Sequence, residues 1–150
     1  MTRVPTDDER RALAAVLDQL IPARPDGSLP GAGALGVGER VVEKLGEAWP
    51  DIAAALSALD TEARERGATS FGELGDEEAE SALNALGATH PGFLPGLVFH
   101  TYTTYYHHPR VLEQLGVPPR PPHPEGYSVE PGDLGLLDAV RQRGRRYREA

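Results

Sequence analysis

Apolar residues recur every three or four positions along most of the first 116 residues, which is the spacing of amphipathic helices. In the first run, Thr6 and Glu9 form a capping-box pattern before the apolar positions begin, and Pro22 ends the run. Three later runs predict further helices: 38–46, Pro50–Gly67 and Asp76–Gly87.

The stretch FHTYTTYYHH, residues 99–108, gives conflicting local signals. TYTTYY has strong β propensity, but its neighbours recur with helical spacing and no other segment predicts a partner strand. We therefore predict a helix that begins at Pro91 and ends at Pro109. Its core-facing stripe is predicted to comprise Leu94, Leu97, Val98, Thr101 and Tyr105. A second side is predicted to carry Phe99, Tyr102 and Tyr106.

The character of the chain changes after Gly116. The following residues are rich in proline and are expected to run extended, close to polyproline II. A last amphipathic segment presents Leu134, Leu137 and Val140 and ends in an arginine-rich stretch. The sequence thus predicts an all-α fold with a domain of about five to six helices at 1–116. Residues 117–150 are predicted to form a proline-rich arm and a basic helix, which pack on the same domain or on a partner.

Charge and composition exclude several classes of function. The net charge is −8 and the pI is about 5.1, which argues against nucleic-acid binding, because phosphate contacts require clustered Lys and Arg. The chain has no cysteine, which excludes disulfides, thiolate metal sites and a Cys nucleophile. No run approaches the roughly 20 apolar residues that span a bilayer, so no membrane insertion is expected. We see no leader at the N-terminus and expect a cytoplasmic protein that leaves the cytoplasm only with a partner.

Motifs for catalysis, metals or nucleotides are weak. His100 and His107 lie seven residues apart, about 10 Å along a helix, whereas two imidazoles share a zinc ion at i, i+4 spacing. GAGALG at 31–36 matches the dinucleotide-binding glycine pattern, but it follows a proline-containing loop rather than a strand. No serine occurs in a nucleophile-elbow motif. We therefore predict no catalytic, cofactor-binding or metal-binding residue in this chain.

The aromatic cluster is better explained by packing. A helix that is apolar over much of its circumference is either central to its domain or shared with another surface. Tyrosine is frequent at interfaces because its ring can be buried while its hydroxyl stays hydrogen-bonded. The sequence therefore predicts core on one side of this helix and an interface on the other.

Four phrases resemble the gluconate 2-dehydrogenase subunit 3 family: LAAVLDQLIPA, LPGAGALGVGERV, SFGELGDEEAESALNAL and HTYTTYYHHPRVLEQLG. The end of the chain, RPPHPEGYSVEPGDLGLLDAVRQRGRRYRE, resembles a branch with a proline-rich arm. The resemblance implies a small helical accessory subunit without a cofactor of its own. It also implies a partner of the glucose–methanol–choline oxidoreductase family, which carries FAD and oxidises sugars or polyols.

The first hypothesis is therefore a non-catalytic subunit that stabilises a flavin-dependent dehydrogenase. Its predicted contact residues are Tyr102, Tyr106, His107, Arg110, Pro119, Pro122 and Tyr127. The alternative is a stand-alone helical protein in which His100, His107, Tyr102 and Glu113 line a small-molecule or metal pocket. A third possibility is self-association, in which a second copy covers the aromatic side.

Overall fold

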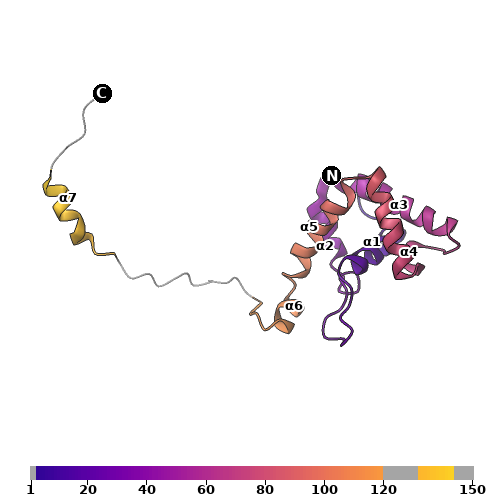
Figure 1. Cartoon of the computed structure of the whole chain (residues 1–150), viewed down its shortest axis with the longest axis horizontal. Helices are drawn as coiled ribbons and strands as arrows, with labels where there is room; N and C mark the ends of the chain where they lie inside the picture. Colours follow the sequence, from indigo (N-terminus) through magenta and orange to yellow (C-terminus); the bar gives the residue numbers. More distant parts are fainter. Residues whose placement is uncertain (1–2, 120–131, 144–150) are drawn as a thin grey trace, which may run out of the picture. The chain divides into compact units, whose positions relative to one another are not determined.

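The computed structural model describes residues 3–119 and 132–143. These residues form α-helices and short 3₁₀ helices (η), with no β-strand among them. The all-α prediction is confirmed, including a helix through TYTTYY. The described residues divide into two units, one within 1–119 and one within 120–150 (Figure 1).

The first unit contains α1 (Asp7–Leu20), α2 (Gly38–Leu45), η1 (Gly46–Ala48), α3 (Trp49–Glu65), η2 (Phe71–Glu73), α4 (Asp76–Thr89), α5 (Phe93–Tyr105) and α6 (Pro109–Gln114). The second unit contains η3 (Leu134–Leu137) and α7 (Asp138–Gln142).

Helix α1 begins at the predicted capping box. The backbone N–H of Glu9 donates to Thr6 Oγ1 at 3.3 Å, and the backbone N–H of Thr6 donates to Glu9 Oε2 at 2.8 Å. Two backbone N–H groups at the helix start are thereby satisfied by side chains. The helix ends at Ile21, whose N–H donates to Leu17, and Pro22 prevents its continuation.

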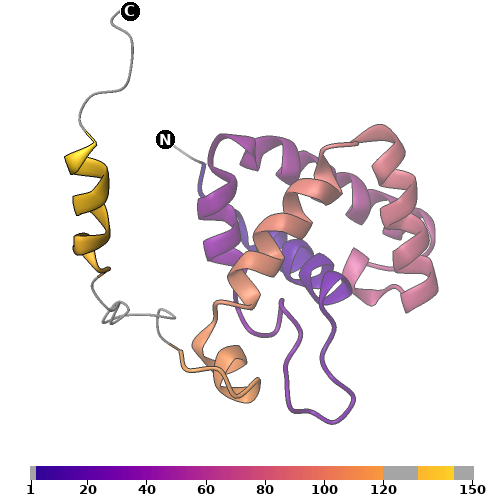
Figure 2. The same ribbon diagram turned by 60° about the vertical axis from the view of Figure 1, so that its left-hand side comes forward.

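The core is built around α1, which contacts α2, α3, α4 and α5 (Figure 2). Its apolar face is fully covered: Leu13 is 2% exposed, and Val16 and Leu17 are 0% exposed. Fully burying a side chain of this size contributes about 1.5–3 kcal/mol to stability. The capped helix α1 is therefore the central element of the domain.

The loop between α1 and α2 is held tightly against α1. Asp18 accepts a hydrogen bond from the backbone N–H of Ala34 at 3.1 Å. A Cβ at Gly31 would lie 2.2 Å from Asp18 Oδ1, and a Cβ at Gly33 would lie 2.0 Å from the backbone oxygen of Ala14. The glycines of GAGALG thus permit close packing of loop on helix. The loop follows no strand, and the backbone at Gly31 and Gly33 lies directly against α1. The motif therefore does not form a dinucleotide-binding loop.

The boundaries and the faces of α5 differ in part from the sequence prediction. The helix begins at Phe93, two residues after the predicted start, and α4 continues through Gly87 to Thr89. Val98 was predicted to face the core, but it is 38% exposed. Leu97 and Thr101 are buried as predicted. The prediction for Val98 was wrong. Val98 lies four residues before Tyr102, so it shares the exposed side of α5 with that tyrosine rather than the side that faces the core.

Tyr105 anchors the end of α5 to the loop after α1. Its side chain is 2% exposed, and its hydroxyl donates to the carbonyl of Pro30 at 2.8 Å. Burial raises the pKa of the Tyr105 hydroxyl above its ordinary value, and the neighbouring Tyr106 acts in the same direction. The hydroxyl therefore stays protonated and keeps its role as a donor.

We predict that Gly33→Ala lowers the free energy of unfolding by about 2–3 kcal/mol, because the new methyl group overlaps a backbone oxygen of α1. Urea denaturation monitored by circular dichroism measures the loss. Gly96→Ala is the matched control: its Cβ meets open space inside α5, so stability should rise by about 0.5–1 kcal/mol. A stable Gly33→Ala variant would contradict the close packing of loop on helix.

A second prediction concerns the Tyr105 hydroxyl. Tyr105→Phe should lower the free energy of unfolding by about 1–2 kcal/mol, because the partly buried bond to the Pro30 carbonyl is lost. Tyr102→Phe should change it by less than about 0.5 kcal/mol, because the Tyr102 ring is 43% exposed and its hydroxyl lies 3.5 Å from its nearest acceptor. Equal losses for both variants would contradict an anchoring role for Tyr105.

Candidate partner interface

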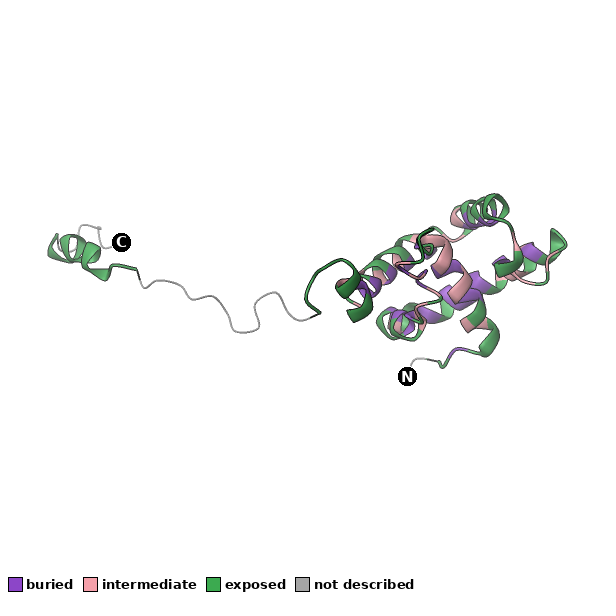
Figure 3. Cartoon of the chain, turned by 90° about the horizontal axis from the view of Figure 1, so that it is seen from below, coloured by how far each residue is buried: buried purple, intermediate pink, exposed green. Residues whose placement is uncertain are grey.

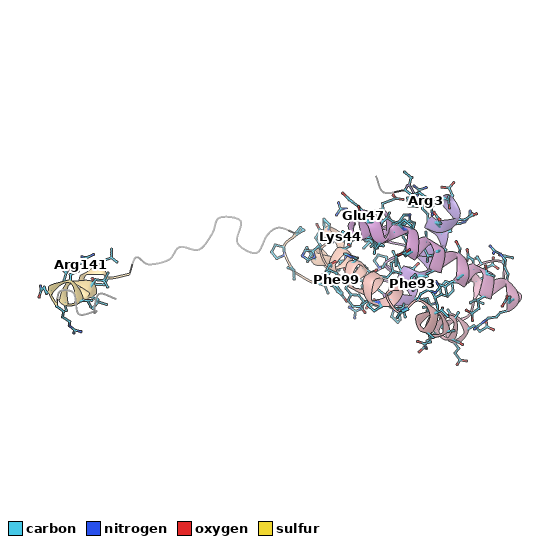
Figure 4. The ribbon with its side chains drawn as sticks, turned by 90° about the horizontal axis from the view of Figure 1, so that it is seen from above. Arg3, Lys44, Glu47, Phe93, Phe99 and Arg141 are labelled. Atoms are coloured by element: carbon cyan, nitrogen blue, oxygen red, sulfur yellow. The ribbon has the colours of Figure 1, made fainter. Side chains whose placement is uncertain are left out.

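One side of α5 is apolar and uncovered within the first unit. We call it the outer face of α5 and define it by Val98, Phe99, Tyr102 and Tyr106, which are 38%, 64%, 43% and 43% exposed. Figure 4 labels Phe99, the most exposed of the four. Contiguous apolar side chains of this size on a small domain mark interaction sites more often than chance placement does.

The outer face follows from the periodicity of α5. Val98, Tyr102 and Tyr106 are spaced by four residues, so their side chains lie on one side of the helix. The other side is buried, and Figure 3 shows buried and exposed residues alternating along the helices of the first unit. Its buried residues are Phe93, Leu97, Thr101, Thr104 and Tyr105. The helix thus divides its apolar residues between the core and the surface.

Ring contacts hold the exposed tyrosines in place. The rings of Tyr102 and Tyr106 lie 5.9 Å apart between centroids at an interplanar angle of 45°. Tyr106 also meets the buried Tyr105 edge to face, with centroids 5.2 Å apart at 83°. Such aromatic pairs contribute about 0.5–1.5 kcal/mol beyond the burial of their area. Because Tyr105 is fixed in the core, the two exposed rings present a preorganised surface.

The histidines at the end of α5 do not assemble into a metal site. The Nδ1 atom of His107, just beyond α5, lies 2.6 Å from the backbone oxygen of Thr103 in the last turn of that helix. The ring of His100 packs edge-on against Phe99, with centroids 5.2 Å apart. Among residues 3–119 and 132–143, no group of three or more His, Cys, Asp or Glu side chains could hold a metal ion.

The remaining predicted contact residues are distributed over two parts of the chain. His107, Arg110 and Pro119 are exposed in the first unit. His107 directly follows Tyr106, the last residue of the outer face, and Arg110 lies in α6. Pro122 and Tyr127 lie outside the described residues.

Two clefts of the first unit involve other residues. A cleft of about 730 Å³ is bordered by the carboxylates of Asp18, Asp76 and Glu80. A second of about 400 Å³ lies beside His90 and Phe93. The residues of the alternative hypothesis, His100, His107, Tyr102 and Glu113, line neither cleft. Neither of these two clefts is therefore the pocket that the alternative hypothesis predicts.

Sequence reasoning missed one member of the outer face. Val98 was placed on the core stripe because it directly follows Leu97 and lies i+4 from Leu94. The spacing from Val98 to Tyr102 and Tyr106 is the signal that places it correctly. Apolar residues on both sides of α5 made the two stripes difficult to separate from periodicity alone.

Among the described residues, no helix is both long enough and apolar enough to cross a membrane. Searches of curated proteins and of solved structures found no match to this chain. The family model of gluconate 2-dehydrogenase subunit 3 matches residues 7–118, which cover α1 to α6 and therefore the outer face of α5. That match covers well over half of the 150 residues, so the chain belongs to the gluconate 2-dehydrogenase subunit 3 family.

Proposed function

We propose that this chain is a non-catalytic accessory subunit that binds and stabilises a flavin-dependent sugar or polyol dehydrogenase. The partner belongs to the glucose–methanol–choline oxidoreductase family and carries the FAD. The outer face of α5 is the centre of the contact surface. The observation that carries the proposal is the uncovered aromatic face in a domain whose family is named for a dehydrogenase subunit.

The composition of the outer face supports a protein partner. Aromatic residues are enriched at the cores of protein interfaces, and charged residues are depleted there. The outer face follows this pattern, since it holds three aromatic rings and a valine. Tyr102 and Tyr106 are each 43% exposed, and a partner can cover a tyrosine ring while it hydrogen-bonds to the hydroxyl.

The rigidity of the outer face favours binding. An interface side chain that must be ordered on binding costs about 0.5–1.5 kcal/mol. The ring contacts among Tyr102, Tyr106 and the buried Tyr105 reduce that cost, because the rings are already held before the partner arrives. A partner that binds this face only in its folded state is stabilised against unfolding by RT ln(1 + L/Kd), where L is the free concentration of this chain.

In this proposal the chain contributes surface, and the redox chemistry belongs to the partner. Two hydroxyls of α5 make contacts within the domain: the Tyr105 hydroxyl donates to the carbonyl of Pro30, and Thr103 Oγ1 donates to the backbone oxygen of Phe99 at 2.9 Å. Neither group is available to act on a substrate. The accessory role therefore uses the outer face of α5 and leaves the hydroxyls of Thr103 and Tyr105 to the fold.

We predict that the tagged chain, purified from its own host, carries with it a larger protein with the absorbance spectrum of a bound flavin. Absorbance between 350 and 500 nm and mass spectrometry of the eluted bands test this prediction, and each measurement needs a mock purification from untagged cells as its control. A colourless protein that elutes as a dimer of this chain would contradict the proposal, because a second copy would then cover the outer face.

We further predict that Tyr102→Ala/Tyr106→Ala weakens binding to the flavoprotein at least about tenfold, since truncated aromatic anchors often cost 2 kcal/mol or more. The isolated chain should lose far less stability, because both rings are 43% exposed. Titration calorimetry and urea denaturation give the two quantities.

Val4→Ala is the matched control for these substitutions. Val4 is an apolar residue that is 72% exposed and lies before α1, so its truncation should leave both quantities unchanged. If the double variant lost folding stability and binding to the same extent, its tyrosines would belong to the core and the assignment of the interface would be wrong.

A further inference from the structure

The second unit lies beyond the family domain. The family model matches residues 7–118, whereas the second unit begins at Arg120. Its described part, 132–143, contains η3 and α7, and each of its large apolar residues is exposed (Figure 3). Leu134 is 69%, Leu136 76%, Leu137 44% and Val140 58% exposed. These four apolar side chains, all within seven residues, are not buried in a core of their own unit. A surface outside this unit is needed to cover them.

These four residues form a broad apolar face. Leu136 and Val140 are four residues apart and Leu137 and Val140 are three apart, so the three side chains share one side of the helical segment. Leu134 and Leu137 eclipse each other across η3. Leu136 and Leu137 are adjacent in η3 and therefore point about 120° apart. The apolar face is therefore wider than the narrow stripe that an amphipathic helix inserts into a groove of a partner protein.

The charge of this segment is opposite to that of the helical domain. Residues 1–119 hold nine basic and eighteen acidic residues, for a net charge of −9. Residues 132–150 hold five arginines and three acidic residues, for a net charge of +2. The two acidic residues of the described segment have local partners. Asp133 accepts from the backbone N–H of Gly135 at 2.9 Å, and Asp138 pairs with Arg141 at 3.2 Å.

We propose that the segment around α7 is an interfacial anchor that binds the surface of an anionic lipid bilayer. Leu134, Leu136, Leu137 and Val140 enter the boundary between headgroups and acyl chains, and the arginines contact lipid phosphates. A basic segment with a broad apolar face is the type of helix that lies in the plane of a membrane surface. Its nine helical residues are far fewer than the roughly 20 that span a bilayer.

Charge complementarity selects the occupant. An anionic bilayer attracts each nearby basic residue with about 1 kcal/mol, which is about fivefold in the partition coefficient. The guanidinium group binds phosphate in a planar, bidentate geometry, and all basic residues of 132–150 are arginines. Figure 4 shows Arg141 at the side of α7. The acidic helical domain would be repelled by the same surface, so attraction is confined to the anchor.

The test is co-sedimentation of the full chain with vesicles of phosphatidylcholine, alone or with phosphatidylglycerol at a ratio of about two to one. Binding is expected on the anionic vesicles and to be at least about tenfold weaker on the neutral ones. Leu136→Ser/Val140→Ser should reduce binding to anionic vesicles at least about tenfold, because it removes half of the apolar face. Arg143→Gln/Arg145→Gln should reduce it about 25-fold and leave neutral vesicles unaffected.

The matched control is Tyr102→Ala/Tyr106→Ala, which removes exposed apolar surface from α5 and should leave vesicle binding unchanged. In the complex with the flavoprotein the pattern should be reversed: the α5 variant loses the partner and the α7 variant keeps it. The two proposals thus fail independently. Absent or charge-independent vesicle binding overturns the anchor. Loss of the flavoprotein by Leu136→Ser/Val140→Ser also overturns it, because α7 would then dock on a protein.

Discussion

The helical domain depends on the burial of one face of α1. Leu13, Val16 and Leu17 lie where α2, α3, α4 and α5 meet, so each of these helices covers part of the same apolar stripe. The glycines of the loop after α1 extend this constraint, since Gly33 brings the chain against the backbone of Ala14. Tyr105 closes the arrangement by donating to Pro30 of that loop. The position of α5 is therefore fixed from α1 outward.

Fixing α5 in this way determines which of its residues reach the surface. Tyr105 and Tyr106 are neighbours in sequence, yet the first is 2% and the second 43% exposed. Their rings touch edge to face, so the core holds the surface ring directly. A docking surface that is coupled to the core needs no separate ordering when a partner binds. The packing that stabilises the domain is thus also the packing that prepares the outer face.

The sequence predicts local features better than it predicts which side of a helix faces the core. The capping box at Thr6, the stop at Pro22 and the helix through TYTTYY follow from short-range rules, and the structure confirms them. The predicted end of α5 at Pro109 was wrong, because α5 ends at Tyr105 and Pro109 begins α6. The assignment of Val98 failed because α5 is apolar on two sides, so periodicity alone does not rank them. The packing of Gly31 and Gly33 on α1 depends on tertiary contact, and their spacing in sequence resembles an unrelated nucleotide motif.

The two apolar surfaces of the chain differ in what stabilises the helix beneath them. The outer face belongs to a thirteen-residue helix whose other side is buried, so α5 is formed whether or not a partner is present. The nine helical residues from Leu134 to Gln142 have no buried side. Isolated helices shorter than about 12–15 residues are marginal in water, because nucleation is costly. A segment of this length gains helical stability from whatever surface covers its apolar face. Binding and helix formation are therefore coupled at α7, whereas α5 binds as a rigid surface.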